Sequence, residues 1–305
     1  MPTTRKIIGA LTATAAIGAA TVLVGCGSSD TSSASDTRAA AAGTSTTDAT
    51  VCPTITKGKL TIGTDNPAYP PWFQGDPPAG SDWKVSDPNS GQGYESAVAY
   101  AVASDMGYSK DQVVWQVTPF SQSYAPGPKK FDFFINQVSY TPERAKNVDF
   151  SKSYYTVTQA VVALKGTPIA KATTIADLKP YTLGAQVGTT AYTAIKDQIQ
   201  PDQDPRVYDN QNDVVAALKG KQVDGVVVDL PTAFYVTAAQ VPNSVIVGQL
   251  PAPDGAQEHF GLVMAKNSPI LACVNAAIYS NTQDGTFKNL QAKWLSKDAG
   301  APVLG

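Results

Sequence analysis

The sequence predicts an α/β protein with two lobes and mainly parallel sheets. Two observations support this prediction. Short β-rich segments alternate with helical segments along residues 51–305, which is typical of strand–helix–strand units. That stretch is also long for a single sheet, so two lobes are expected. The 4 Trp, 13 Tyr and 9 Phe all lie after position 50, so the first 50 residues add almost nothing to a core.

The expected elements can be placed from composition and periodicity. Strands are expected at residues 59–64, 113–117, 131–135, 159–164, 182–187, 223–228 and 260–264. Helices are expected at 95–106 and 213–219, from Ala191, from Pro231, and twice between 270 and 295. A further helix is expected after Thr141, because Thr141-Pro142-Glu143 offers an N-cap, a proline at the first helical position and an acid in the first turn. Residues 75–92 are rich in Gly, Pro, Ser, Asp and Asn, and are expected to form a surface loop.

The composition argues against several kinds of partner and site. The 305 residues include 23 Lys plus Arg and 25 Asp plus Glu, which gives a net charge of −2. Because there is no basic excess, we expect no nucleic-acid partner and no attraction to anionic lipid heads. One His and three Cys argue against a His-rich metal site or an iron–sulfur site. We therefore expect neither a metal nor a cofactor.

The N-terminus has the pattern of an export signal. Arg5 and Lys6 precede the uncharged, apolar run Ile7–Val24, which is typical of a secretory signal peptide. A retained transmembrane anchor is the alternative, although Thr and Gly dilute the run and make a stable span marginal.

The residues after this run favour a lipoprotein. Leu23-Val24-Gly25-Cys26 resembles the bacterial lipobox, in which the Cys becomes the lipidated N-terminus. Residues 1–25 are therefore expected to be a lipoprotein signal peptide. Residues 26–51, rich in Ser, Thr, Ala, Asp and Gly, are expected to be a lipidated, disordered tether.

Two cysteines remain in the folded region, Cys52 at its start and Cys273 near the C-terminus. An exported chain meets oxidising conditions, so we expect a disulfide between them. Such a bond would tie the two ends of the fold together. The alternative is a pair of buried free thiols.

Polar and aromatic residues follow the expected strands, at the ends where open α/β sheets bind ligands. Thr189 and Thr190 follow Gly188 at a helix start, where free N–H groups suit a carboxylate. Arg144 offers that carboxylate a bidentate fork. Asp229 can accept hydrogen bonds from an ammonium group.

Tyr69 and Trp72 add flat apolar walls. Each of these signals has a plainer interpretation: a helix start, a solvated charge, an N-cap or loop packing. Their shared place at strand ends favours an α-amino acid site.

The same residues carry a resemblance to a known family. The matching segments are Gly58–Asp65, Tyr69–Phe73, Gly93–Glu95, Ser139–Arg144, Val148–Ser151, Tyr154–Tyr155, Gly188–Thr190, Ala217–Gly220, Val223–Asp229, Asp284–Gly285 and Lys293–Trp294. With them, residues 58–294 resemble the bacterial extracellular solute-binding proteins of family 3, which bind polar amino acids for ATP-driven importers. The segment from Ser139 to Ser151 is the most specific piece.

The resemblance implies a two-lobed type II periplasmic-binding fold with a hinge of two crossover strands. Lobe 1 would comprise residues 52–155 and 258–305, and lobe 2 residues 156–257. The implied function is capture of an L-amino acid by lobe closure and its delivery to the permease of an ABC-type importer. The protein would be a monomer without enzymatic activity, lipid-anchored at the extracytoplasmic face of the cell membrane.

The resemblance also implies roles for single residues. Arg144 would hold the ligand carboxylate, with main-chain N–H groups near Ser139 and Thr190. Asp229 would hold the ammonium group, with groups near Gln137 and Ser139. Tyr69 or Trp72 would stack on the ligand side chain.

Three features depart from the family pattern, all in lobe 1. The loop at 75–92 is long, and Gln137 stands where small residues are common. Residues 121–128, which contain two prolines, replace a short helix and are not expected to form a regular one.

Glu95 could face a polar or basic ligand side chain, or could simply start a helix. Two other functions stay open. One is a cyclohexadienyl-dehydratase-like enzyme on the same fold, with Glu95 or His259 as general acid or base. The other is a ligand-sensing partner of a membrane receptor.

Overall fold

The computed structural model describes residues 52–252, 257–295 and 301–305, which belong to one compact unit, Thr50–Gly305. The expected signal peptide, the tether and Cys26 lie outside the described residues. Within the described part of the chain, no helix is long and apolar enough to cross a membrane.

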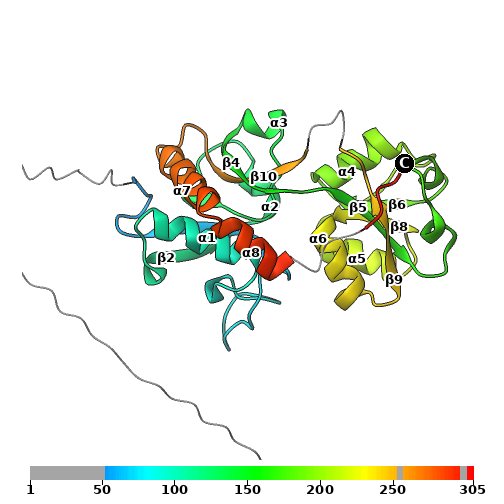
Figure 1. Cartoon of the computed structure of the whole chain (residues 1–305), viewed down its shortest axis with the longest axis horizontal. Coiled ribbons are helices and arrows are strands. Elements are labelled where there is room, and N and C mark those ends of the chain that lie inside the picture. Colours follow the sequence, from blue (N-terminus) through cyan, green and yellow to red (C-terminus); the bar gives the residue numbers. More distant parts are fainter. Residues whose placement is uncertain (1–51, 253–256, 296–300) are drawn as a thin grey trace, which may run out of the picture. The chain divides into compact units, whose positions relative to one another are not determined.

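The first lobe is built on a five-stranded sheet with the order β2-β1-β3-β10-β4. Figure 1 labels β2, β4 and β10 of this sheet. Its core includes the buried side chains of Leu60, Ile62, Phe133 and Leu262. Helix α1 packs against both α7 and α8. The elements of this lobe are β1 (Leu60–Thr64), α1 (Tyr94–Asp105), β2 (Val113–Val117), α2 (Phe120–Ser123), β3 (Phe133–Phe134), α3 (Pro142–Ala145), β4 (Val148–Thr156), β10 (His259–Ala265), α7 (Leu271–Gln283) and α8 (Thr286–Leu295).

The second lobe is built on a sheet with the order β7-β6-β8-β5-β9. Along β5, Val161 and Ala163 enter one apolar cluster while Ala160 and Val162 enter another. This alternation means that both faces of the sheet are covered. The elements are β5 (Gln159–Leu164), β6 (Leu183–Gln186), α4 (Thr190–Ala194), β7 (Arg206–Tyr208), α5 (Gln211–Lys219), β8 (Gly225–Asp229), α6 (Leu230–Tyr235) and β9 (Ser244–Gln249), with π-helical turns after α4 (Ile195–Ile199) and α6 (Val236–Gln240).

The α/β, two-lobed architecture is confirmed, but the expectation of mainly parallel sheets is wrong. Four strand pairings are parallel and four are antiparallel. All four antiparallel pairings involve β5 or β10. These two strands enter their sheets from the other lobe rather than from a crossover helix, so they run against their neighbours.

Several local expectations also need correction. Strands β4, β7 and β9 were not expected from the sequence. The sequence of β4 shows no clean alternation, since its exposed residues Lys152 and Ser153 are adjacent. Residues 121–128 were expected to lack regular helix, yet Phe120–Ser123 form one helical turn, which ends before Pro126.

The chain passes between the lobes more often than expected. The two predicted crossovers follow Thr156 and Gln249. In addition, Val303 pairs with Gln249 of β9, and Leu304 is buried in the core of the second lobe. The last five residues therefore belong with the second sheet, although 258–305 was assigned to lobe 1. The other lobe boundaries stay predictions.

The predicted disulfide is present. Cys52 and Cys273 are bonded, with their Cα atoms 6.1 Å apart and 221 positions apart in sequence. The bond joins the start of the folded region to α7.

Candidate ligand-binding site

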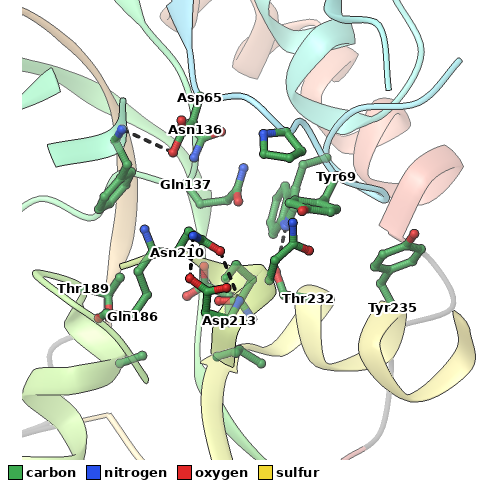
Figure 2. A pocket seen from close by; sticks show the side chains of 18 of the residues that line it. Asp65, Tyr69, Asn136, Gln137, Gln186, Thr189, Asn210, Asp213, Thr232 and Tyr235 are labelled. Carbon is green, nitrogen blue, oxygen red and sulfur yellow. Dashed lines mark hydrogen bonds between the residues drawn. The ribbon is translucent and has the colours of Figure 1, made fainter. Parts of the chain in front are cut away.

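A cavity of about 310 Å³ is lined by residues of both lobes (Figure 2). This size lies in the range of small-molecule sites. In the view of Figure 2, Gln186 and Thr189 lie on one side, and Tyr69 and Tyr235 on the other. Seven of the eight predicted ligand-binding residues line the cavity, namely Tyr69, Trp72, Gln137, Arg144, Thr189, Thr190 and Asp229.

Arg144 joins the two lobes at the cavity. Its side chain is buried, and it donates hydrogen bonds to the carbonyl of Ser139 (2.6 Å) and the carbonyl of Gly188 (2.8 Å). The guanidinium also lies over the ring of Tyr124, 4.6 Å from its centroid, an arrangement that stabilises a buried cation. Burial lowers the pKa of Arg144, but a guanidinium stays charged at neutral pH.

The backbone around Arg144 explains why it can hold this position. Thr141 caps α3 as predicted, since its hydroxyl accepts from the backbone N–H of Arg144 at 3.1 Å. Across the lobes, Gly188 has a φ of +69°, and a Cβ there would lie 2.6 Å from the Tyr124 hydroxyl. Only glycine fits this turn without strain.

The start of α4 follows the sequence prediction. Thr189 is the N-cap, and its hydroxyl accepts from the backbone N–H of Tyr192 at 3.2 Å. Thr190 is the first residue of the helix, and its hydroxyl lies 3.4 Å from that of Ser139 in the other lobe. Both threonines line the cavity.

Asp229 lies at the end of β8 beside a second carboxylate. Gln159 Nε2 donates to Asp229 Oδ1 at 2.8 Å and to Glu258 Oε2 at 3.0 Å. Asp229 is partly buried and lines the cavity. Burial raises the pKa of Asp229 well above its usual range, and the charge of Glu258 adds to this effect.

Ser139 was predicted to bind the ligand, but it is not among the described residues that line the cavity. Its hydroxyl donates to Glu258 Oε1, and its carbonyl accepts from Arg144. Ser139 therefore helps to hold the side chains of Glu258 and Arg144 in place. Sequence reasoning missed Glu258 and Gln159, because Gln159 meets Asp229 only through the unexpected antiparallel pairing of β5 with β8.

Glu95 does not face the cavity. It is fully buried and accepts hydrogen bonds from the backbone N–H of Gln137 (2.7 Å), from the Gln137 amide and from the Tyr154 hydroxyl (2.5 Å). Burial raises its pKa to about 7. Gln137 has a positive φ of 48°. The hydrogen bonds to Glu95 therefore hold an unusual backbone conformation at Gln137 in place.

Tyr69 and Trp72 differ in their exposure to the cavity. The Tyr69 hydroxyl is buried and has no well-formed hydrogen bond among the described residues, although Asn212 lies close; burial raises its pKa to about 12. Trp72 is only 1% exposed and packs edge-on against Tyr94, Tyr155 and Phe260. Tyr69 is thus the better candidate for a stacking surface.

The cavity lining also contains residues that the sequence did not single out. Asn210 caps α5 and also donates from its side chain to Asp213 Oδ2 at 2.8 Å. Asp65 accepts from two backbone N–H groups, and burial raises its pKa. Among the described lining residues Arg144 is the one cation, whereas Asp65, Asp213 and Asp229 are acids.

Two other expectations concern chemistry. His259 stacks on Tyr140, with ring centroids 5.6 Å apart, and neither His259 nor Glu95 is among the lining residues. Within the described ranges, no three His, Cys, Asp or Glu side chains gather as metal ligands would.

The long loop at 75–92 was expected near the site, but none of the described lining residues comes from it.

Comparisons with known proteins agree with this architecture. The L-cystine-binding protein TcyJ of Escherichia coli (strain K12) is 28% identical over 246 residues, covering 79% of this chain and 84% of that protein. An ancestral arginine-binding protein bound to arginine has a TM-score of 0.62 at 28% identity, covering 78% and 98%. The ancestral amino acid-binding protein AncCDT-1, a precursor of cyclohexadienyl dehydratase, has a TM-score of 0.62 at 27% identity, covering 78% and 95%. The model for bacterial extracellular solute-binding proteins, family 3, matches residues 60–297, and the chain therefore belongs to this family.

Proposed function

We propose that the protein captures a free L-amino acid outside the cytoplasm and delivers it to an ABC-type importer. The observation that carries this proposal is the separation of charge in one small cavity. Arg144 supplies a guanidinium from one lobe, and Asp229 supplies a carboxylate from the other. A zwitterion complements such a pair better than a purely anionic or cationic molecule does. Relatives with named amino-acid ligands support the same reading.

In this proposal each predicted residue has a role. Arg144, with Thr189 and Thr190, holds the ligand carboxylate. Asp229 holds the ammonium group. Ser139 acts indirectly: it donates to Glu258, which shares the Gln159 amide with Asp229. The residues come from both lobes, so ligand binding would shift the population toward the closed arrangement.

The other predicted residues contact the rest of the ligand. Tyr69 stacks on its side chain, Gln137 contacts it, and Trp72 closes the wall behind. The acids Asp65 and Asp213 lie among the lining residues on the Tyr69 side. An acidic side chain would meet two carboxylates there without a second cation among the described lining residues. We therefore expect uncharged polar or cationic amino acids to bind better than aspartate or glutamate.

Anchoring and location are part of the same proposal. The lipobox-like Leu23–Cys26 supports removal of residues 1–25 and lipidation of Cys26, which would hold a monomeric protein at the outer face of the membrane. Metabolic labelling with a fatty acid should label the wild-type chain and leave Cys26→Ala unlabelled. Equal labelling of both would contradict the lipid anchor.

We propose binding without chemistry. A dehydratase needs a placed general acid, and the two candidates from the sequence, Glu95 and His259, are not among the described residues that line the cavity. The similarity to AncCDT-1 concerns an amino acid-binding precursor of such an enzyme rather than the enzyme itself.

A thermal-shift screen against the twenty standard amino acids, followed by calorimetry, tests the proposal. A ligand of the native state raises the melting temperature, so we expect a subset of amino acids to do so and to bind with one site per chain. The bound amino acid should be recovered unchanged. Recovery of a modified product would favour the enzyme, and no shift with any amino acid would contradict the proposed function.

A further inference from the structure

Two carboxylates next to the cavity share one hydrogen-bond donor. Gln159 Nε2 lies 2.8 Å from Asp229 Oδ1 and 3.0 Å from Glu258 Oε2. The second oxygen of Glu258 accepts from the Ser139 hydroxyl. Asp229 lines the cavity, whereas Glu258 is not among the described lining residues. One amide group therefore holds two acids close together at the place proposed for the ligand ammonium.

The groups around Asp229 and Glu258 do not supply enough positive charge to neutralise both carboxylates. The titratable and charged groups that face it come from four further places in the fold: Glu258 before β10, Glu95 on α1, Tyr154 on β4 and Arg144 on α3. Arg144 is the one cation in this set, and it already donates to two main-chain carbonyls. Three acids thus face one cation in a largely buried region.

Two carboxyl groups held this close together in a partly buried region cannot both ionise without a large electrostatic cost, so such a pair tends to keep one proton. The proton belongs on Asp229, since burial and then the charge of Glu258 raise the pKa of Asp229 well above its usual range. Glu258 accepts hydrogen bonds from Ser139 and Gln159. A protonated Asp229 is a poor partner for an ammonium group, because it lacks the negative charge.

We propose that Glu258, a positioning residue held beside Asp229 by Gln159 and Ser139, acts together with the burial of Asp229 to keep a proton on that carboxyl group until an amino acid binds, so that binding releases this proton. The inference rests on the proposed function. The incoming ammonium group keeps its own three protons and donates hydrogen bonds to the ionised Asp229. The O–H proton of Asp229 passes to the solvent. One positive charge thus enters the site as one leaves it.

This linkage fixes the direction of a pH effect. The empty protein binds one proton more than the complex, so affinity rises with pH over the range in which Asp229 titrates. The slope of the logarithm of affinity against pH should approach about +1, the number of protons released. Glu258→Gln removes the neighbouring charge. The burial of Asp229 remains, so its pKa should fall only in part, and the range in which the slope is near +1 should end at a lower pH than in the wild type.

The first test needs no amino acid. Carboxyl carbons are followed by NMR in the wild-type protein, with Asp229→Asn to assign the signal. We expect Asp229 to titrate well above the ordinary aspartate value of about 3.9, and to move toward it in Glu258→Gln. Glu143→Gln, which removes an exposed glutamate on α3, is the matched control and should change nothing. An ordinary titration of Asp229, or one unaffected by Glu258→Gln, would overturn the proposal.

The second test measures the released proton. The standard L-amino acids that raise the melting temperature are titrated by calorimetry in two buffers of different ionisation enthalpy, between about pH 5 and pH 8. We expect the wild type to release up to about one proton and the control variant to match it. Glu258→Gln should release clearly less than the wild type at the upper end of this pH range, because the charge next to Asp229 is gone while its burial remains. Binding without proton release would overturn this inference and leave the proposed function intact. Failure of all twenty to bind would overturn the proposed function and the release step with it.

Discussion

Trp72 Nε1 donates a 2.9 Å hydrogen bond to Thr232 Oγ1, which joins the first lobe to helix α6 of the second. The indole ring is held in the first lobe by edge-on contacts with Tyr94, Tyr155 and Phe260. Both partners line the cavity. This hydrogen bond can form only when the two lobes are close together. It therefore favours the closed arrangement in addition to any contacts that a ligand makes.

Thr232→Val should therefore weaken amino-acid binding. It removes the acceptor at nearly constant volume, and a net hydrogen bond contributes about 0.5–1.5 kcal/mol, so affinity should fall by roughly twofold to tenfold. Thr232→Ser keeps the hydroxyl and should bind almost as the wild type does. Calorimetry on the three proteins measures this difference. Equal affinity of the valine variant and the wild type would show that the bond does not favour closure.

Arg144→Ala should cost a few kcal/mol of affinity, because it leaves a ligand carboxylate buried without its cation. Arg144→Lys should fall between alanine and wild type, since it keeps the charge and loses the bidentate fork. Arg206→Ala, at an exposed position on β7, is the control and should bind normally. If Arg144→Ala bound an amino acid within about threefold of the wild-type affinity, Arg144 would not be the carboxylate partner.

The sequence was sufficient to predict the features that depend on local pattern. The strands at Val113–Val117 and Gln159–Leu164 have the predicted bounds, because each is a short β-rich segment between turn residues. Thr141 was recognised as an N-cap from the Thr-Pro-Glu order, and the structure confirms the capping bond. Most predicted site residues line one cavity because strand ends of α/β sheets meet at one edge.

Features that depend on pairing between distant segments could not be predicted. Gln159 meets Asp229 because β5 runs antiparallel to β8, and nothing local to either strand indicates that direction. Glu258 reaches the same amide from a connection between the lobes. Leu304 belongs to the stretch 258–305 that was expected in lobe 1, yet it packs over Gly248 of β9 in the second lobe. Each case requires knowledge of which segment lies beside which.

Asp229→Asn should separate recognition of the amine from recognition of the carboxylate. The asparagine side chain has the shape of aspartate but cannot carry a negative charge, so amino acids should bind roughly tenfold to a hundredfold more weakly. Analogues with the same side chain and a hydroxyl or keto group in place of the amine should bind both proteins similarly. Competition calorimetry with matched pairs measures this. An equal loss for both ligand types would exclude Asp229 as the ammonium partner.

Removal of the Cys52–Cys273 bond should lower stability without changing affinity. In the chain-entropy model a crosslink across so long a loop contributes roughly 5 kcal/mol, although many measured values are smaller. The bond lies in the first lobe, and neither cysteine is among the described lining residues. The double variant Cys52→Ser, Cys273→Ser should melt several degrees lower and bind as before. A melting temperature equal to that of the oxidised wild type would show that the bond adds nothing to stability.

Glu95 should make the folded state less stable as the pH rises. Its folded pKa of about 7 lies above the ordinary value of 4.5, so the native state holds this proton more tightly than the unfolded chain does. The stabilisation is complete below pH 4.5, is lost progressively up to about pH 7, and stays lost above it. Glu95→Gln keeps an acceptor for the Gln137 N–H and has no charge to bury.

Urea unfolding of wild type and Glu95→Gln at several pH values from about pH 4 to pH 8 tests this prediction. The glutamine variant should gain stability relative to wild type by about 1–3 kcal/mol across this range. The other titrating groups act on both proteins alike, so the difference isolates Glu95. Glu143→Gln, at the exposed position on α3, should run parallel to wild type. If the Glu95→Gln curve also ran parallel, Glu95 would have to be ionised at no cost in its buried site, against the physical reason for its raised pKa.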